Sequence, residues 1–236
     1  MKILITLGAT TEAIDGVRFI TNFSTGKTGS ALADILSEKG HKVFALCGQY
    51  AKTPLKAKNT IFTDFNDLNL KLKKMLATGK FDMLINAAAI SDFSLDFIEV
   101  DGKKYKPASL PKISSKSSLK LTLKNNFKII DRVKTYASAG AASGGKKELF
   151  VVGFKLTNKA SKTVAKKSAK AVLADIVVHN DLSEIQKKNR PFNIFKDGIE
   201  IAKLNGVAAL ANYLGNIQST NKPLAQAQKS GQSRKS

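Results

Sequence analysis

The sequence is poor in the residues on which several common protein classes depend. Its 236 residues include one cysteine, two histidines and no tryptophan. The single Cys47 excludes an internal disulfide framework, and with only two histidines a Cys/His zinc site is disfavoured. The longest mainly apolar stretch, Met83 to Ile90, is far shorter than the roughly 18 residues that a bilayer-spanning helix needs. We therefore expect a soluble, reduced, cytoplasmic protein with no membrane partner.

Acidic residues are also scarce, because 18 Asp and Glu face 39 Lys and Arg, which gives a formal charge of +21. Such an excess favours polyanionic partners. Only four basic residues are Arg, the side chain best suited to reading base edges, and aromatic residues make up 7% of the chain. We therefore expect no specific nucleic acid, although a basic nucleic-acid-binding protein stays an alternative. Residues 102–130 and 153–174 contain lysines and no acid, which indicates anionic ligands.

Strand and helix patterns alternate along most of the chain. Short apolar or β-branched runs predict strands, and apolar residues at helical spacing predict helices. Asp-Gly at 197–198 separates two further runs and predicts a β-hairpin. The predicted strands are 2–7, 42–46, 60–63, 83–87, 119–123, 149–154 and 175–178, and the predicted helices are 28–39, 66–77, 127–136, 161–173 and 206–214.

This alternation predicts an α/β fold, namely a doubly wound, mostly parallel, Rossmann-like sheet with a flap and a small β-hairpin region. Residues 8–26 are expected to form a long loop, 102–118 the flap, and 137–147 a flexible loop. Residues 1–217 are expected to form a single domain, and 218–236 a basic, disordered tail. Ligands of such sheets bind beyond the carboxyl ends of the strands, so the loops there are the candidate site.

Three familiar nucleotide motifs are incomplete. The glycine fingerprint of dinucleotide-binding proteins is absent after the first strand, and Leu46-Cys47-Gly48 lacks the ribose-binding acid. The sequence of segment 21–28 is similar to the P-loop pattern but has Thr in place of its first Gly. No Tyr is followed four residues later by Lys, as a short-chain reductase requires. A nicotinamide-dependent short-chain reductase therefore remains only an alternative.

The segment from Ser24 to Gly29 opens the first predicted helix. Backbone N–H groups and the positive end of the helix dipole favour a phosphate at such a position. An ordinary Ser/Thr N-cap would explain the same residues. Glu12, Asp15 and Arg18 lie in the preceding loop, where pairing with each other on the surface would account for them equally well.

Five sequence blocks, in this order along residues 3–214, resemble phosphopantothenoylcysteine synthetase. The blocks are Gly8-Ala9-Thr10-x-Glu12-x-Ile14-Asp15-x-Val17-Arg18-x-Ile20-x-Asn22 with Ser24-Thr25-Gly26-Lys27-x-Gly29, then Ala87-Ala88-Ala89-Ile90-Ser91-Asp92-Phe93, Lys112-Ile113, Val152-Gly153-Phe154-Lys155 and Val178-His179-Asn180-Asp181-Leu182. The resemblance implies a phosphopantothenate–cysteine ligase of coenzyme A synthesis. Such an enzyme activates 4′-phosphopantothenate with CTP, or with ATP, and Mg²⁺, and then forms the amide with cysteine.

The resemblance also implies site residues and partners. Asn22 and Lys112 correspond to catalytic positions. The protein ligands of the metal are left open, because Mg²⁺ is expected to be held mainly by the triphosphate, with Asp92 as a candidate ligand. The resemblance implies a homodimer. It is to the free-standing type of synthetase, which has no decarboxylase domain. A separate decarboxylase would then act on the product. The implied nucleotide-binding residues are Gly8, Ser24, Thr25, Gly26, Ala88, Asp92, Phe154, Lys166, Lys170 and Asn180.

The chain departs from the family pattern at three places. The usual Gly-Gly-Thr is Gly8-Ala9-Thr10, the usual Lys-Ile-Lys-Lys keeps only its first lysine at Lys112, and the usual Ala-Asn-Asp has His179 as its first residue. The register of the lysines on the helix 161–173 also differs. These departures leave the choice between CTP and ATP open.

Overall fold

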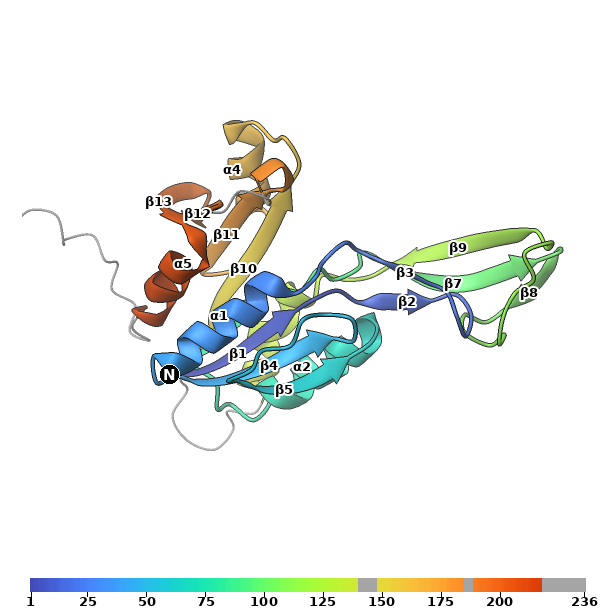
Figure 1. Cartoon of the computed structure of the whole chain (residues 1–236), viewed down its shortest axis with the longest axis horizontal. Coiled ribbons are helices and arrows are strands. Elements are labelled where there is room, and N and C mark those ends of the chain that lie inside the picture. Colours follow the sequence, from blue (N-terminus) through green and yellow to red (C-terminus); the bar gives the residue numbers. More distant parts are fainter. Residues whose placement is uncertain (140–147, 185–188, 218–236) are drawn as a thin grey trace, which may run out of the picture.

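A computed structural model describes residues 1–139, 148–184 and 189–217. Most of the expected flexible loop at 137–147 and the expected tail at 218–236 lie outside the described residues. The described chain forms a body built on an eight-stranded sheet, from which an arm of five further strands extends sideways (Figure 1).

The central sheet has the strand order β13-β12-β11-β10-β6-β1-β4-β5. The strands from β11 to β5 in this order run parallel, and β12 and β13 form an antiparallel hairpin at one edge. This is the doubly wound order, so the predicted Rossmann-like fold is confirmed. The strands are β1 Lys2–Leu7, β4 Lys42–Gly48, β5 Lys58–Phe62, β6 Met83–Asn86, β10 Phe150–Thr157, β11 Ile176–Asp181, β12 Pro191–Lys196 and β13 Ile199–Asn205.

Helices cover both faces of this sheet, which explains why its parallel strands are almost wholly apolar. Along β1, Ile3 and Ile5 pack beneath α1 (Lys27–Glu38) and α5 (Gly206–Gly215), whereas Leu4 faces α2 (Phe65–Leu76). The α2 face is also covered by a 3₁₀ turn, by α3 and by α4. Their bounds are Ile129–Arg132, Val133–Ser138 and Lys162–Lys170.

The predicted hairpin is also confirmed. Asp197 and Gly198 join β12 to β13 with φ values of 51° and 77°, the positive values of a type I′ turn. Within the described ranges, no helix is long and apolar enough to cross a membrane.

The arm is where the structure differs from the sequence-based expectation. The expected loop at 8–26 contains a two-stranded ribbon of β2 (Thr11–Ala13) and β3 (Phe19–Thr21). A three-stranded sheet, β8-β7-β9, lies beside it and is formed by Lys103–Tyr105, Phe93–Val100 and Leu119–Asn125. The strand expected at 119–123 therefore belongs to the arm, and the expected flap at 102–118 begins with β8. Three-residue strands are too short to show a periodic pattern, which is why the ribbon escapes sequence analysis.

Helix α1 packs against β1 so closely that Gly29 has no room for a methyl group. A Cβ atom built on Gly29 would lie 2.5 Å from the Cβ atom of Leu7. Helix propensity alone would make Gly29→Ala stabilising by about 1 kcal/mol. Overpacking costs about 1–3 kcal/mol, so we expect Gly29→Ala to lower the melting temperature.

Thermal unfolding followed by circular dichroism tests this expectation. Lys27→Ala, at an exposed position in the same helical turn, is the matched control and should change the free energy of unfolding by less than about 0.5 kcal/mol. A melting temperature for Gly29→Ala at or above that of the wild type would contradict the packing described here.

Candidate active site

The carboxyl ends of β1 and β6 are adjacent, and the chain leaves them in different directions. From β1 it passes through the ribbon to α1, whereas from β6 it enters the arm at β7. This point, where the strand order reverses, is where doubly wound sheets bind their ligands. The predicted residues Gly8 and Ala88 lie here, directly after the two strands.

Backbone hydrogen bonds tie the two strand ends together. The Ala89 N–H donates to the Gly8 carbonyl at 2.7 Å, and the Thr10 N–H donates to the Ala89 carbonyl at 3.3 Å. The buried Thr6 hydroxyl donates to Asn86 Oδ1 at 2.7 Å and accepts from the Ala88 N–H at 3.3 Å. The segment around Ala88 is thus held rigidly beside the end of β1.

Asn22 joins this group from the ribbon. Its Nδ2 donates to the carbonyl of Ile90 at 3.2 Å, and the side chain is exposed. The preceding Thr21 hydroxyl donates to the Thr10 carbonyl at 2.8 Å, which fixes the base of the ribbon. The structure therefore brings Asn22, Gly8 and the segment after β6 together.

The N-terminus of α1 completes this side of the site. Gly26 is its N-cap in the left-handed conformation, with φ of 70°, and no side chain caps the helix. Ser24 and Thr25 are therefore not an ordinary N-cap, the alternative that the sequence left open. Because neither hydroxyl is used as the cap, the first N–H groups of the helix are suited to an anionic ligand.

Close contacts explain the glycines around this helix start. A Cβ atom on Gly8 would lie 2.5 Å from the Cβ of Ala51, and one on Gly26 would lie 2.7 Å from the same atom. Both residues also have positive φ, of 82° and 70°. A Cβ on Gly48, at the end of β4, would lie 2.6 Å from the carbonyl oxygen of Ala9. The three glycines therefore allow the end of β1, the start of α1 and the end of β4 to pack closely together.

Phe154 and Asn180 lie on the same face of the sheet as α1. Phe154 packs with Val178 beneath α1 and α5, and Asn180, two residues along β11, points to the same side. Arg190, just before β12, also reaches this region, because its guanidinium donates to the hydroxyl of Thr28 in the first turn of α1. No sequence motif indicates Arg190, since it lies 162 residues from its partner.

A polar network on the opposite face fixes the loop between β10 and α4. Asp181 Oδ2 accepts from the Thr157 hydroxyl at 2.7 Å, and the same hydroxyl lies 2.8 Å from Nε2 of His179. Because the carboxylate takes the hydroxyl proton, His179 must donate through Nε2. Burial lowers the pKa of His179, which favours the neutral ring. Its Nδ1 has no hydrogen-bond partner among the described residues.

The lysines of α4 do not join the predicted group. Helix α4 lies on the face of the sheet opposite α1, as shown by the packing of Ala169 on Val177 and Phe195. Lys166 and Lys170 are exposed, and the Lys170 side chain lies beside Gly198, at the far edge of the sheet. Within one chain the structure thus brings neither lysine to the start of α1.

Asp92 lies near the base of the arm with an exposed carboxylate. It pairs with the ammonium group of Lys128, and its backbone carbonyl accepts from the Asn126 N–H at 2.8 Å. Among the described residues, no group of three or more His, Cys, Asp or Glu side chains could hold a metal ion. Asp92 therefore offers a metal one carboxylate, which fits an ion that is held mainly by phosphates.

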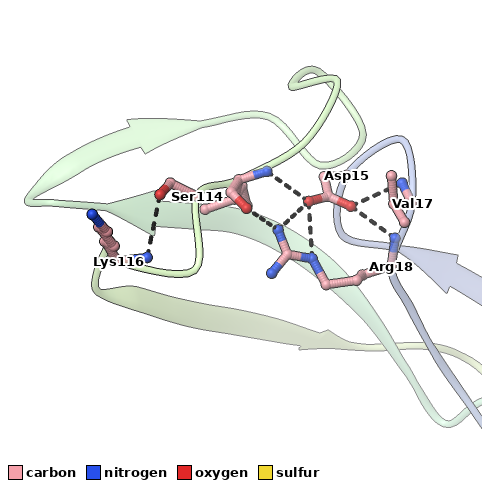
Figure 2. A network of polar contacts seen from close by, with 6 residues as sticks. Asp15, Val17, Arg18, Ser114 and Lys116 are labelled. Carbon is pink, nitrogen blue, oxygen red and sulfur yellow. Dashed lines mark hydrogen bonds and ion pairs between the residues drawn. The ribbon is translucent and has the colours of Figure 1, made fainter.

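Glu12, Asp15 and Arg18 do not form the single surface cluster that composition allowed. Glu12 is buried and accepts the Phe65 N–H at the start of α2, and burial raises its pKa. Asp15 and Arg18 do pair, at 2.6 Å, but the side chain of Asp15 is fully buried. This pair binds the backbone of Ile113, beside Lys112 (Figure 2).

Lys112 is held at the far end of the ribbon. Its neighbour Ile113 is bonded to Asp15 in the turn that joins β2 to β3, whereas Asn22 follows the other end of β3. Four residues of extended chain, from Thr11 to Asp15, span roughly 13 Å. Within one chain, the ribbon therefore separates Lys112 from the other predicted catalytic residue.

Comparisons with known proteins agree with this architecture. The family model described as the DNA/pantothenate metabolism flavoprotein C-terminal domain matches residues 1–214. Two curated relatives, from Methanocaldococcus jannaschii and Thermococcus kodakarensis, are both named coenzyme A biosynthesis bifunctional protein CoaBC. They are 31% and 33% identical over 78% and 77% of this chain. The chain spans 41% of each of these relatives.

Solved structures show the same fold. The DNA/pantothenate metabolism flavoprotein from Streptococcus pneumoniae matches with a TM-score of 0.75 and 26% identity, over 91% of this chain and 96% of its own. A Cab2 H337A mutant in complex with phosphopantothenate-cysteine matches with a TM-score of 0.66, over 90% of this chain and 84% of its own. Its identity of 18% supports the fold alone.

The buried Asp15 carboxylate makes stability depend on pH in a defined direction. Its hydrogen bond with Arg18, and then that with the Ile113 N–H, hold the pKa of Asp15 well below its usual 3.8. A depressed pKa in the folded state adds stability above about pH 4, and this stability is lost as the pH falls toward the folded-state pKa. Urea unfolding should therefore show the wild type more stable than Asp15→Asn at about pH 6, with the gap narrowing below about pH 4.

The control for this measurement is Asp96→Asn, which removes an exposed arm carboxylate that lies 3.5 Å from Lys124. This variant should differ little from the wild type at any pH, because exposed ion pairs contribute little. A gap between wild type and Asp15→Asn that stays constant down to about pH 2 would contradict the assignment.

Proposed function

Because the chain belongs to the family of the DNA/pantothenate metabolism flavoprotein C-terminal domain, we propose that it is a phosphopantothenate–cysteine ligase. The observation that carries this proposal is the family match over residues 1–214, which includes every predicted site residue. The relatives are named for coenzyme A biosynthesis, and we propose that this chain acts in the same pathway. The start of α1, which no side chain caps, supports the use of a phosphorylated substrate.

The proposed reaction has two steps. The carboxylate of 4′-phosphopantothenate first attacks the α-phosphate of CTP, which forms an acyl cytidylate and releases pyrophosphate. The amine of cysteine then attacks the activated carbonyl, which forms the amide and releases CMP. Both steps build up negative charge, on phosphate oxygens and then on the carbonyl oxygen, so donors fixed in place are the main catalytic requirement.

The residues around the end of β1 are suited to these steps. The start of α1, with Ser24, Thr25 and Gly26, would receive the triphosphate, and Phe154 and Asn180 lie on the same face for the nucleoside. Asn22 would donate to the activated carbonyl, beside Ala88. Mg²⁺ would be held by the phosphates, with Asp92 as a further oxygen ligand, and would neutralise their charge. ATP stays open as the alternative nucleotide.

The arm supports a homodimer. It exposes apolar side chains, with Val17 62%, Phe93 48% and Leu123 46% exposed. A small sheet with such a surface is marginal on its own and is stabilised by a partner. We propose that two chains pair through their arms and that Lys112 of each chain serves the site of the other. This arrangement would overcome the separation of Lys112 from Asn22 within one chain.

The product of this reaction carries a carboxylate next to the new amide, a group that a decarboxylase can remove. We propose that a decarboxylase accepts the product.

The direct test incubates the protein with 4′-phosphopantothenate, cysteine, Mg²⁺ and either CTP or ATP, followed by mass spectrometry. We expect the amide product, with CMP or AMP and pyrophosphate in equal amounts. Omission of cysteine should leave acyl nucleotide and no amide. No amide with either nucleotide would contradict the proposal, and oxidation of NADPH across a substrate panel would favour the reductase instead.

The dimer is tested by mixing two inactive variants. Lys112→Gln and Asn22→Asp should each lose more than about 10²-fold in kcat, because each removes a donor to developing charge. If Lys112 serves the partner's site, a mixed dimer has one site with both residues intact, so refolding the two variants together should restore up to a quarter of wild-type activity. Recovery near zero, with mixed dimers present, would show that Lys112 acts within its own chain.

A further inference from the structure

The carboxylate of Asp15 is the centre of the polar network in the arm (Figure 2). Its Oδ1 accepts the backbone N–H groups of Val17 and Arg18 at 2.9 and 2.7 Å. Its Oδ2 accepts Nε and Nη2 of Arg18, at 3.0 and 2.6 Å, and the N–H of Ile113, at 2.9 Å. Five donors thus converge on one buried side chain from two segments almost a hundred residues apart.

Both backbone groups of Ile113 are used by this pair. While its N–H donates to Asp15, its carbonyl accepts Nη2 of Arg18 at 2.6 Å. The side chain of Ile113 is 3% exposed and packs with Ile14, Leu95 and Ile98. The residue that follows Lys112 is therefore fixed by two charge-assisted hydrogen bonds and by packing.

The same turn also fixes the residues that precede Lys112. The Gly16 N–H donates to the Leu110 carbonyl at 3.0 Å. Gly16 approaches the flap so closely that a Cβ atom there would lie 2.5 Å from the carbonyl oxygen of Pro111. The backbone on each side of Lys112 is thus attached to the ribbon, while the Lys112 side chain itself is exposed. In the part of the chain that the structure describes, its ammonium group forms no hydrogen bond or ion pair.

We propose that Asp15 and Arg18 are positioning residues that set the place of the Lys112 ammonium group. The inference rests on the proposed function, in which Lys112 stabilises charge at the reacting phosphate or anhydride. Holding Ile113 by both N–H and C=O fixes the direction in which the preceding residue projects. A misplacement of about 1 Å at a reacting centre can cost about 10²-fold in rate, so loosening this clamp should lower catalysis without removing a substrate contact.

A double-mutant cycle tests the proposal, with Asp15→Asn, Lys112→Gln and the double variant assayed by product mass spectrometry. Asp15→Asn should lower kcat about 10- to 100-fold and change the KM values for CTP and 4′-phosphopantothenate less than about threefold. In the Lys112→Gln background, Asp15→Asn should change the residual rate less than about twofold, because the group that it positions is gone. An unchanged kcat, or the same loss in both backgrounds, would overturn the proposal.

The matched control is Glu99→Gln, which breaks the 2.9 Å pair with Lys120 on the same arm and should leave kcat unchanged. If Asp15→Asn does not fold, Arg18→Lys gives the same test. Lysine keeps the charge next to Asp15 but cannot also reach the carbonyl of Ile113, so kcat should again fall with KM unchanged. A wild-type protein that makes no amide would overturn the proposed function, whereas a wild-type rate retained by Asp15→Asn would overturn this inference alone.

Discussion

The close approach of three backbone segments at the end of β1 is the constraint on which the site depends. The Cβ-free positions Gly8, Gly26 and Gly48 let the end of β1, the start of α1 and the loop after β4 meet at distances that no larger residue permits. The usual dinucleotide fold places its glycines within one short turn. Here the chain leaves the sheet after Gly8, forms the ribbon, and returns at Gly26. The glycines thus come together although the ribbon, which carries Asn22 and the Asp15–Arg18 pair, separates Gly8 from Gly26 in the sequence.

Some of the few acids of this basic chain organise backbone. Besides Asp15, the carboxylate of Asp181 accepts the N–H groups of Lys159, Ala160 and Ser183, at 2.9 to 3.1 Å. Asp34 accepts two N–H groups of the segment before β5, at 2.8 and 2.7 Å. Other acids pair with lysines. Because 39 Lys and Arg face only 18 Asp and Glu, an excess of positive charge is still available to anionic substrates.

Sequence patterns predicted the body of the fold because its signals are local. Parallel strands buried on both faces are short apolar runs, and Asp197-Gly198 requires no distant contact to specify a hairpin. The arm could not be predicted in the same way. Strand β7 is covered by Ile14 and Ile113, which lie far from it in sequence, and the ribbon strands have three residues each.

The site residues fall into two similar groups, those with a local sequence signal and those fixed by distant contacts. Gly8, Ser24 and Gly26 follow from the resemblance, and the structure places Gly26 at the N-cap of α1. The sequence placed Asp15 and Arg18 near each other but could not show that they bind Ile113, because that contact spans 98 residues. The resemblance also implied Lys166 and Lys170, which the face on which α4 packs separates from α1.

The arm combines two properties that are hard to reconcile in a single chain. It carries Lys112 on a backbone that two hydrogen bonds of the next residue, Ile113, attach to Asp15 and Arg18, yet it extends away from the residues that Lys112 must serve. The segment that carries Lys112 cannot leave the ribbon without breaking the buried Asp15 contacts, and a buried charge left without its partner is strongly unfavourable. The rigidity becomes useful if the arm meets a second site outside its own chain. The exposed apolar side chains of the arm then have a surface to cover them. The clamp on Lys112 and the proposed pairing of arms are therefore compatible, because a stiff arm of one chain would complete the site of the other.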